Sequence, residues 1–185
     1  MPTHARERLV AAAEKLFYSE GIHAVGVDRL LSESGVGRAS FYRHFPSKDD
    51  LVVEIIEGYD RRWRAALEEA VQAQEGDPLA VFDALGKQFA APDFRGCASI
   101  NAMVEVADPE SRAYQVAVRH KHSVIAFLAG LLKEAGVDGH AAMAERFMML
   151  MDGATVTALR EGDPAPAGNS KEIARELLGW PADGA

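Results

Sequence analysis

The sequence predicts an all-α fold, and three features of its pattern lead to this expectation. Apolar residues recur at helical spacing, as Leu9, Ala13 and Leu16 do at i, i+4 and i+7. Glycines and prolines separate the periodic stretches, and no stretch alternates apolar and polar residues convincingly as a half-buried strand would. With 185 residues, 48% of them hydrophobic, the chain is large enough for one domain or for two that share a core.

Three short helices are predicted in the first domain, residues 1–47. The first spans residues 4–20 and ends at Gly21. A second, around Val27 to Leu31, is followed by the turn-forming sequence Gly35-Val36-Gly37, and a third runs from Arg38 to Phe45 before Pro46. The expected core of this small bundle is Phe17, Leu30, Val36, Phe41 and Phe45.

Residues 48–185 are predicted to form a second, larger helical domain. It begins with a long helix over residues 48–74, which Ser47 caps and Asp49 and Asp50 favour in its first turn. The segment 162–168, with its two prolines, is expected to be a loop. The other helices are predicted at residues 78–90, 99–106, 109–135, 139–161 and 171–178.

Charge and cysteine content exclude several classes of protein. The net charge is −8, yet the first 48 residues hold seven basic and five acidic side chains, so a mildly basic unit precedes an acidic body. The single cysteine, Cys97, permits no internal disulfide and is expected to be a small buried residue in a reducing compartment. No signal-like or membrane-spanning segment is found, which predicts a cytoplasmic protein with no membrane partner.

Polar side chains on the predicted third helix are typical of a DNA reader. A helix, a glycine turn and a short second helix form the helix-turn-helix arrangement, in which the second helix enters the major groove. Arg38 and Ser40 stand at the start of that helix, where a guanidinium and a hydroxyl can reach base edges. Tyr42, His44 and Lys48 are expected to donate to phosphates.

The segment GVGRASFYRHFPSKDDL, preceded by VDRLL, resembles the DNA-binding region of TetR-family transcriptional regulators over about residues 6–56. The resemblance implies an all-helical homodimer that binds operator DNA and responds to a small molecule held by a divergent C-terminal domain. Gly26 and Gly37 depart from the family pattern, which often has Ser or Thr there, and each change removes a hydroxyl that can touch phosphate. The predicted DNA-contacting residues are Arg29, Gly37, Arg38, Ala39, Ser40, Tyr42, Arg43, His44 and Lys48.

Inward-facing aromatic and polar residues of the larger domain are the candidates for a small-molecule site. Asn101 and Glu105 lie at i and i+4 and can share one helix face. Dimerisation is expected through the helices at 109–135 and 139–161, because the methionine-rich second helix is apolar nearly all round. The predicted ligand-binding residues are Trp63, Phe82, Phe89, Asn101, Glu105, Phe127, Phe147 and Asp152.

Other functions remain as alternatives. The larger domain can instead bind a protein partner, or the chain can be a helical enzyme or carrier whose first bundle is only structural. No nucleophile with a base is visible, and His120 and His122 at i and i+2 point to different sides of a helix, so neither an enzyme nor a metal or cofactor is predicted. Gly35-Val36-Gly37 does not follow a strand, which argues against a dinucleotide-binding loop.

Overall fold

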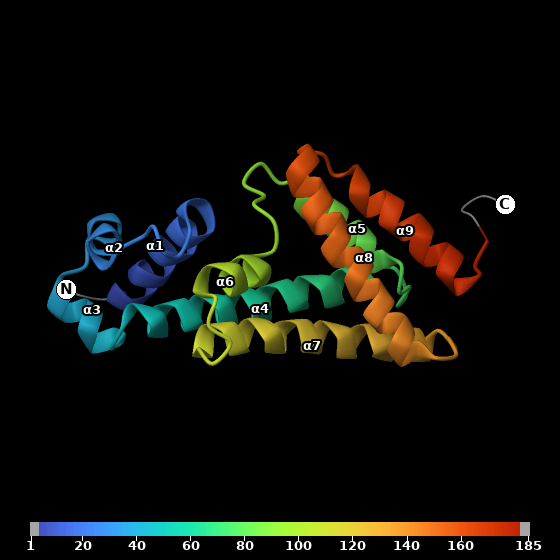
Figure 1. Ribbon diagram of the computed structural model, residues 1–185, viewed down its shortest axis with the longest axis horizontal. Coiled ribbons are helices and arrows are strands. Elements are labelled where there is room, and N and C mark those ends of the chain that lie inside the picture. The colour runs from blue at the N-terminus through green and yellow to red at the C-terminus, as the bar shows by residue number, and fades with distance from the viewer. Residues whose placement is uncertain (1–3, 182–185) are drawn as a thin grey trace. The chain divides into compact units, whose positions relative to one another are not determined.

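The computed structural model describes residues 4–181, and these residues form nine helices and no strand (Figure 1). The predicted all-α class is therefore confirmed. The helices are α1 (Ala5–Glu20), α2 (Val27–Ser34), α3 (Arg38–His44), α4 (Lys48–Gln72), α5 (Ala80–Phe89), α6 (Ala98–Val106), α7 (Arg112–Glu134), α8 (His140–Glu161) and α9 (Ala165–Leu178).

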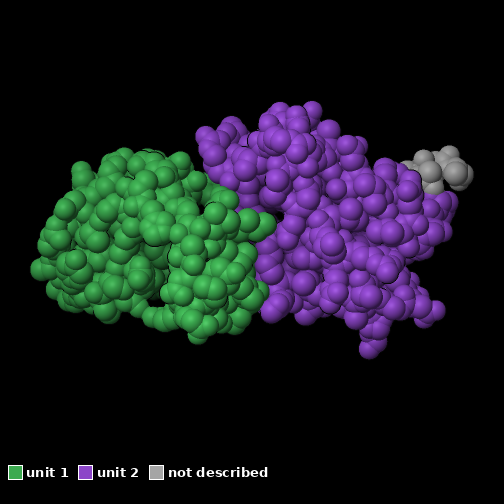
Figure 2. Space-filling model, viewed as in Figure 1, with its two compact units in different colours: residues 1–61, 98–120 green, residues 62–97, 121–185 purple. Residues whose placement is uncertain are grey.

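The chain divides into two compact units, shown in different colours in Figure 2. Unit 1 consists of residues 1–61 and 98–120, and unit 2 of residues 62–97 and 121–185. Helices α4 and α7 therefore contribute residues to both units.

Unit 1 is built around the N-terminal helices, which pack α1 against α2 and α3. All five residues predicted for the core of this bundle are buried. The same apolar cluster takes in Leu51 of α4, Ala102 of α6 and Ala117 of α7. The bundle of α1, α2 and α3 thus shares its core with the first half of α4, with α6 and with the first half of α7.

Unit 2 has its own core, in which α5, α8 and α9 pack against one another. Phe82 of α5 and Phe147 of α8 are fully buried, with ring centroids 5.5 Å apart. Leu128 and Leu132 of α7 belong to the same core. Cys97, at the end of the first segment of unit 2, is only half-buried, which differs from the expected buried position.

Serine hydroxyls cap two of the long helices. Ser47 Oγ accepts the N–H of Asp50 at 3.1 Å at the start of α4, as the sequence predicts. Ser111 Oγ accepts the N–H of Tyr114 at 3.2 Å. Because Ser111 is the residue before α7, this helix begins at Arg112 rather than at residue 109.

The last helix is longer than the sequence suggests. The prediction of a loop over residues 162–168 is wrong, because α9 begins at Ala165. Pro164 immediately precedes this helix and Pro166 is its second residue, and at both positions a missing backbone N–H is tolerated because it has no partner within the helix. Asp163 Oδ1 accepts the N–H of Ala165 at 2.8 Å and satisfies one of the remaining donors.

Among residues 4–181, no helix is both long enough and apolar enough to cross a bilayer.

Candidate nucleic-acid interface

Two glycines with different roles build the turn between α2 and α3. Gly35 ends α2 with a φ of 61°, in the left-handed region where any side chain is strained. Gly37 precedes α3 in an extended conformation with a φ of −71°, and a Cβ placed there meets nothing within 4 Å. Serine would fit at Gly37, so the missing cap hydroxyl has no steric cause.

One face of α3 is held by aromatic packing, which leaves the other face to solvent. Phe41 is 0% exposed, and the ring of Phe45, just after the helix, is also buried. Tyr42 packs edge-on against Phe41 with centroids 5.1 Å apart and keeps 47% of its surface exposed. The exposed residues of the helix are Arg38, Ala39, Tyr42, Arg43 and His44, and Ser40 is half-buried among them.

The two arginines of α3 have intramolecular partners. The guanidinium Nη2 of Arg38 forms an ion pair with Oδ1 of Asp28, in the first turn of α2. Arg43 Nη2 donates to Oγ of Ser40 at 3.0 Å, along the same face of α3. Sequence reasoning missed Asp28, because nothing in the pattern shows that a residue ten positions earlier lies beside Arg38.

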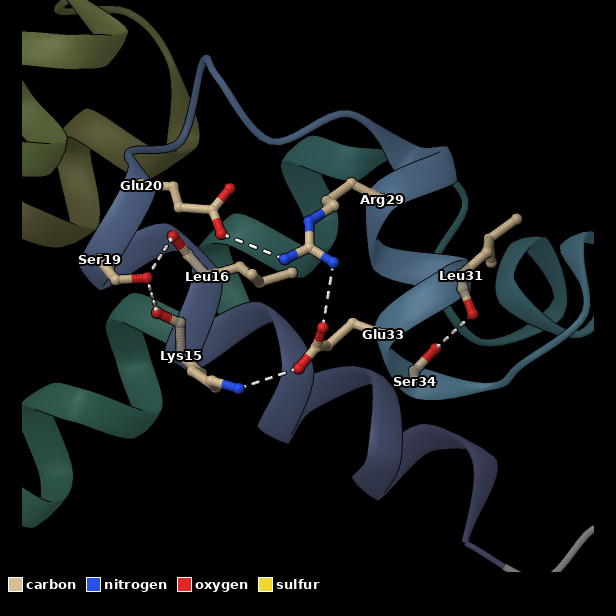
Figure 3. Close-up of polar contacts among 8 residues, drawn as sticks. All are labelled: Lys15, Leu16, Ser19, Glu20, Arg29, Leu31, Glu33 and Ser34. Atoms are coloured by element: carbon tan, nitrogen blue, oxygen red, sulfur yellow. Dashed lines mark hydrogen bonds and ion pairs between the residues drawn. The ribbon is translucent and has the colours of Figure 1, made fainter.

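Arg29 lies in a network that ties α2 to α1 (Figure 3). Its guanidinium donates to Oε2 of Glu33 at 3.0 Å and to Oε1 of Glu20 at 3.3 Å. Lys15 donates to the other oxygen of Glu33 at 2.9 Å. The contacts of Glu33 with Lys15, and after it with Arg29, lower the pKa of the Glu33 carboxyl below its ordinary value. Arg29, predicted to contact DNA, thus also joins the two helices.

Lys48, at the start of α4, is half-buried rather than extended into solvent. Its ammonium donates to the carbonyl oxygen of Ile22 at 2.5 Å and lies 5.8 Å from the ring centroid of Phe17. An ammonium has three N–H donors, and the Ile22 contact uses one of them. Lys48 therefore joins the segment after α1 to the start of α4. In sequence it also lies close to the end of α3.

The structure distributes the predicted ligand-binding residues over both units. Phe82, Phe89 and Phe147 are buried core residues of unit 2, and Phe127 packs at the edge of that core. Asp152 forms an ion pair with Lys121, also in unit 2. Asn101 and Glu105 belong to α6 in unit 1, so the eight residues do not line one cavity.

Glu105 has a defined partner in unit 1. Its Oε2 accepts the backbone N–H of His23 at 3.0 Å, and its carbonyl oxygen contacts Nε2 of the same histidine. This pair joins the end of α6 to the segment between α1 and α2.

Trp63 lines a groove between α4 and α5 in unit 2. The groove has a volume of about 470 Å³. The indole N–H of Trp63 donates to Oε1 of Gln88 at 3.1 Å, and both residues belong to the lining of the groove. Apart from Glu69, Lys87 and Gln88 the lining is apolar, consisting of Trp63, Ala66, Leu67, Ala70, Ala73, Ala84 and Leu85. We call this feature the α4/α5 groove.

Within residues 4–181, no three His, Cys, Asp or Glu side chains are grouped so that they can hold a metal ion. His120 is buried, and its Nδ1 lies 2.5 Å from Oδ1 of Asp60, which gives this histidine a structural partner.

Comparison with known proteins agrees with this geometry. Residues 9–55, which run from within α1 through α2 and α3 into α4, match the family model described as bacterial regulatory proteins, tetR family. The crystal structure of SCO4454, a TetR-family transcriptional regulator from Streptomyces coelicolor, is 32% identical. That match covers 96% of this chain and 95% of SCO4454, with a TM-score of 0.88. The chain belongs to the TetR family.

Two further matches concern one TetR-family relative. The transcriptional repressor NemR of Escherichia coli K12 is 29% identical over 140 residues, which are 73% of this chain and 70% of NemR. The crystal structure of the reduced form of E. coli NemR matches with a TM-score of 0.85 at 25% identity. It covers 96% of this chain and 98% of the NemR chain. This TetR-family chain is thus a helix-turn-helix, DNA-binding transcriptional regulator and not an enzyme.

Proposed function

We propose that this regulator is a repressor that binds a near-palindromic operator as a homodimer and releases it when a small molecule binds. The observation that carries the proposal is the α3 surface, where Phe41 fixes the helix and the polar side chains opposite it face solvent. The repressor NemR among its relatives favours repression over activation.

The proposed DNA contacts divide into two kinds. Arg38 reads base edges in the major groove, because a guanidinium can donate two parallel hydrogen bonds to guanine. Tyr42, His44 and Lys48 contact phosphates, which fixes the position of α3 without reading sequence. Ser40 and Arg43 stand between the two groups. Gly37 and Ala39 carry little or no side chain, so the backbone of α3 can approach the DNA closely.

Exposed apolar side chains on α8 and α9 support the homodimer. Met149 is 74% exposed, and Val156 and Leu159 follow it along α8. Ile173 and Leu177 are exposed on the neighbouring α9. The large apolar side chains of α7 are at least half-buried within one chain, so we propose that α8, within the predicted segment 139–161, pairs with α9 as the dimer surface, and that α9 takes the place of the predicted segment 109–135.

The α4/α5 groove is the proposed effector site. Its volume falls within the range of small-molecule sites, about 300 to 1,000 Å³. The mostly apolar walls favour an apolar, planar molecule that stacks on Trp63 and exchanges hydrogen bonds with Gln88. Helix α4 runs without a break from this groove to Lys48. A change in α4 on effector binding can therefore reach the DNA-binding helices. A domain that binds a protein partner is the competing proposal.

Fluorescence anisotropy on duplexes from the DNA flanking the coding region tests DNA binding. We expect a preference of about 10³ or more for one segment over random DNA, with affinity that falls steeply as salt rises. The proposal would be contradicted if the protein bound neither the flanking duplexes nor fragments from the rest of the genome more tightly than random DNA.

A variant with one tryptophan tests the effector site. Because the chain has two tryptophans, Trp63 and Trp180, Trp180→Phe leaves Trp63 as the sole indole reporter. Planar apolar compounds that release DNA should also change its fluorescence, and Ala70→Leu, which fills the groove, should block both effects. Release of DNA that persists in Ala70→Leu would place the effector elsewhere.

A further inference from the structure

Asp28 occupies an unexpected place for an acidic residue in a DNA-binding bundle. It lies in the first turn of α2, and its side chain is 84% exposed. Its carboxylate is paired with Arg38, the first residue of α3 and the proposed base reader. A carboxylate at this position repels phosphates, so its presence costs DNA affinity unless the pair has a compensating effect.

The chemistry of the guanidinium allows such an effect. A guanidinium has five N–H donors in a rigid plane, and the Asp28 contact is made by Nη2. Donors that remain on the plane can still form the two parallel bonds that guanine requires. A side chain already held in one direction also loses less conformational freedom when it binds.

The same pair affects binding to random sequence. A long arginine that is free to turn can reach any nearby phosphate, and such contacts supply most of nonspecific affinity. In the pair, the charge of Asp28 offsets that of Arg38 and competes with phosphates for its donors. The pairing therefore lowers affinity for random DNA more than affinity for a site with the correct base.

We propose that Asp28 is a positioning residue for sequence recognition: it holds the Arg38 guanidinium for a guanine contact and withholds it from phosphates. This inference rests on the proposed DNA-binding function of α3. It predicts that Asp28 contributes to discrimination between sequences rather than to affinity.

Asp28→Asn tests this role because it keeps the size of the side chain and removes its charge. The measurements are Kd values on a duplex selected by the wild-type protein from a randomised pool and on random duplex. We expect tighter binding of Asp28→Asn to random DNA and a loss of about tenfold in the ratio of the two affinities. A second selection with Asp28→Asn should show relaxed preference at one base pair in each half-site.

A matched control separates positioning from simple removal of negative charge. Asp49 is an exposed acid in the first turn of α4. Asp49→Asn should raise affinity for both duplexes by similar factors and leave their ratio unchanged. In an Arg38→Ala background, Asp28→Asn should no longer change the ratio, because the residue that it positions is gone.

Two results would overturn the inference. One is an unchanged ratio in Asp28→Asn, and the other is an equal loss of ratio with and without Arg38. A wild-type protein that selects no sequence from the pool would overturn the proposed function itself. If the wild type discriminates between selected and random duplex and Asp28→Asn does so equally well, only the role of Asp28 is overturned.

Discussion

The carboxylate of Glu105 accepts the backbone N–H of His23 at 3.0 Å and so joins α6 to the segment between α1 and α2. The fit is close: a Cβ added to Gly21, which has a φ of 94°, would lie 3.0 Å from Oε2 of Glu105. The contact holds the end of α1 in place within unit 1. Glu105 therefore acts in the framework of the DNA-binding bundle.

Removal of this carboxylate should destabilise the protein. Glu105→Ala leaves the His23 N–H without its acceptor, and we expect a loss of about 1 kcal/mol in the free energy of unfolding. Urea denaturation measures the loss. Glu105→Gln retains an acceptor oxygen and should recover part of it, while Glu110→Ala, at an exposed position, should have little effect. A Glu105→Ala protein as stable as wild type would show that the hydrogen bond contributes nothing.

A side chain at Gly35, in the turn before α3, should destabilise the protein. Its φ of 61° is left-handed, so Gly35→Ala should cost about 1 kcal/mol. Gly130 provides the opposite case, since it lies within α7 with open space around it. Gly130→Ala should stabilise the protein by about 0.5 to 1 kcal/mol. Thermal denaturation should therefore show a lower melting temperature for Gly35→Ala and a higher one for Gly130→Ala. Equal shifts in melting temperature would refute the conformational argument.

Most helices could be predicted, because their apolar spacing and the glycines between them are local properties of the sequence. The start of α9 could not be predicted, because proline is common both in loops and at the start of a helix. Pro164 and Pro166 therefore do not distinguish the two. The α3 residues could be proposed from their motif, but the pairing of Arg38 with Asp28 depends on tertiary packing. Phe82 and Phe147 are predicted pocket residues, but both lie in the core of unit 2. The sequence does not separate the two cases, because aromatic side chains both line pockets and fill cores.

Acid should weaken the start of α4 through Asp50. The Ser47 hydroxyl, and after it the Arg112 guanidinium at 2.7 Å, lower the pKa of Asp50 below its ordinary value of 3.8. The ionised carboxylate therefore stabilises the folded state above pH 3.8, and this contribution is lost as the pH falls below that value. Melting temperatures from pH 7 to pH 3 should fall more steeply for wild type than for Asp50→Asn. Parallel curves would contradict the role of Asp50.

A charge on the exposed face of α8 should prevent dimer formation. Met149→Glu places a carboxylate within the proposed apolar interface, where burial without a partner is costly. Sedimentation velocity should show a dimer for wild type and a monomer for this variant. Val104 is 72% exposed on α6, outside α8 and α9, so Val104→Glu should remain dimeric. Dimers of Met149→Glu as stable as those of wild type would exclude this surface.

If α3 reads DNA sequence through Arg38, loss of the guanidinium should reduce discrimination between DNA sequences. The measurement is the ratio of Kd values for random and selected duplex, for wild type and for Arg38→Ala, at one salt concentration. We predict that Arg38→Ala lowers this ratio at least tenfold, as loss of a bidentate base contact should. An equal loss of affinity on both duplexes would contradict the claim, because it would make Arg38 a phosphate contact.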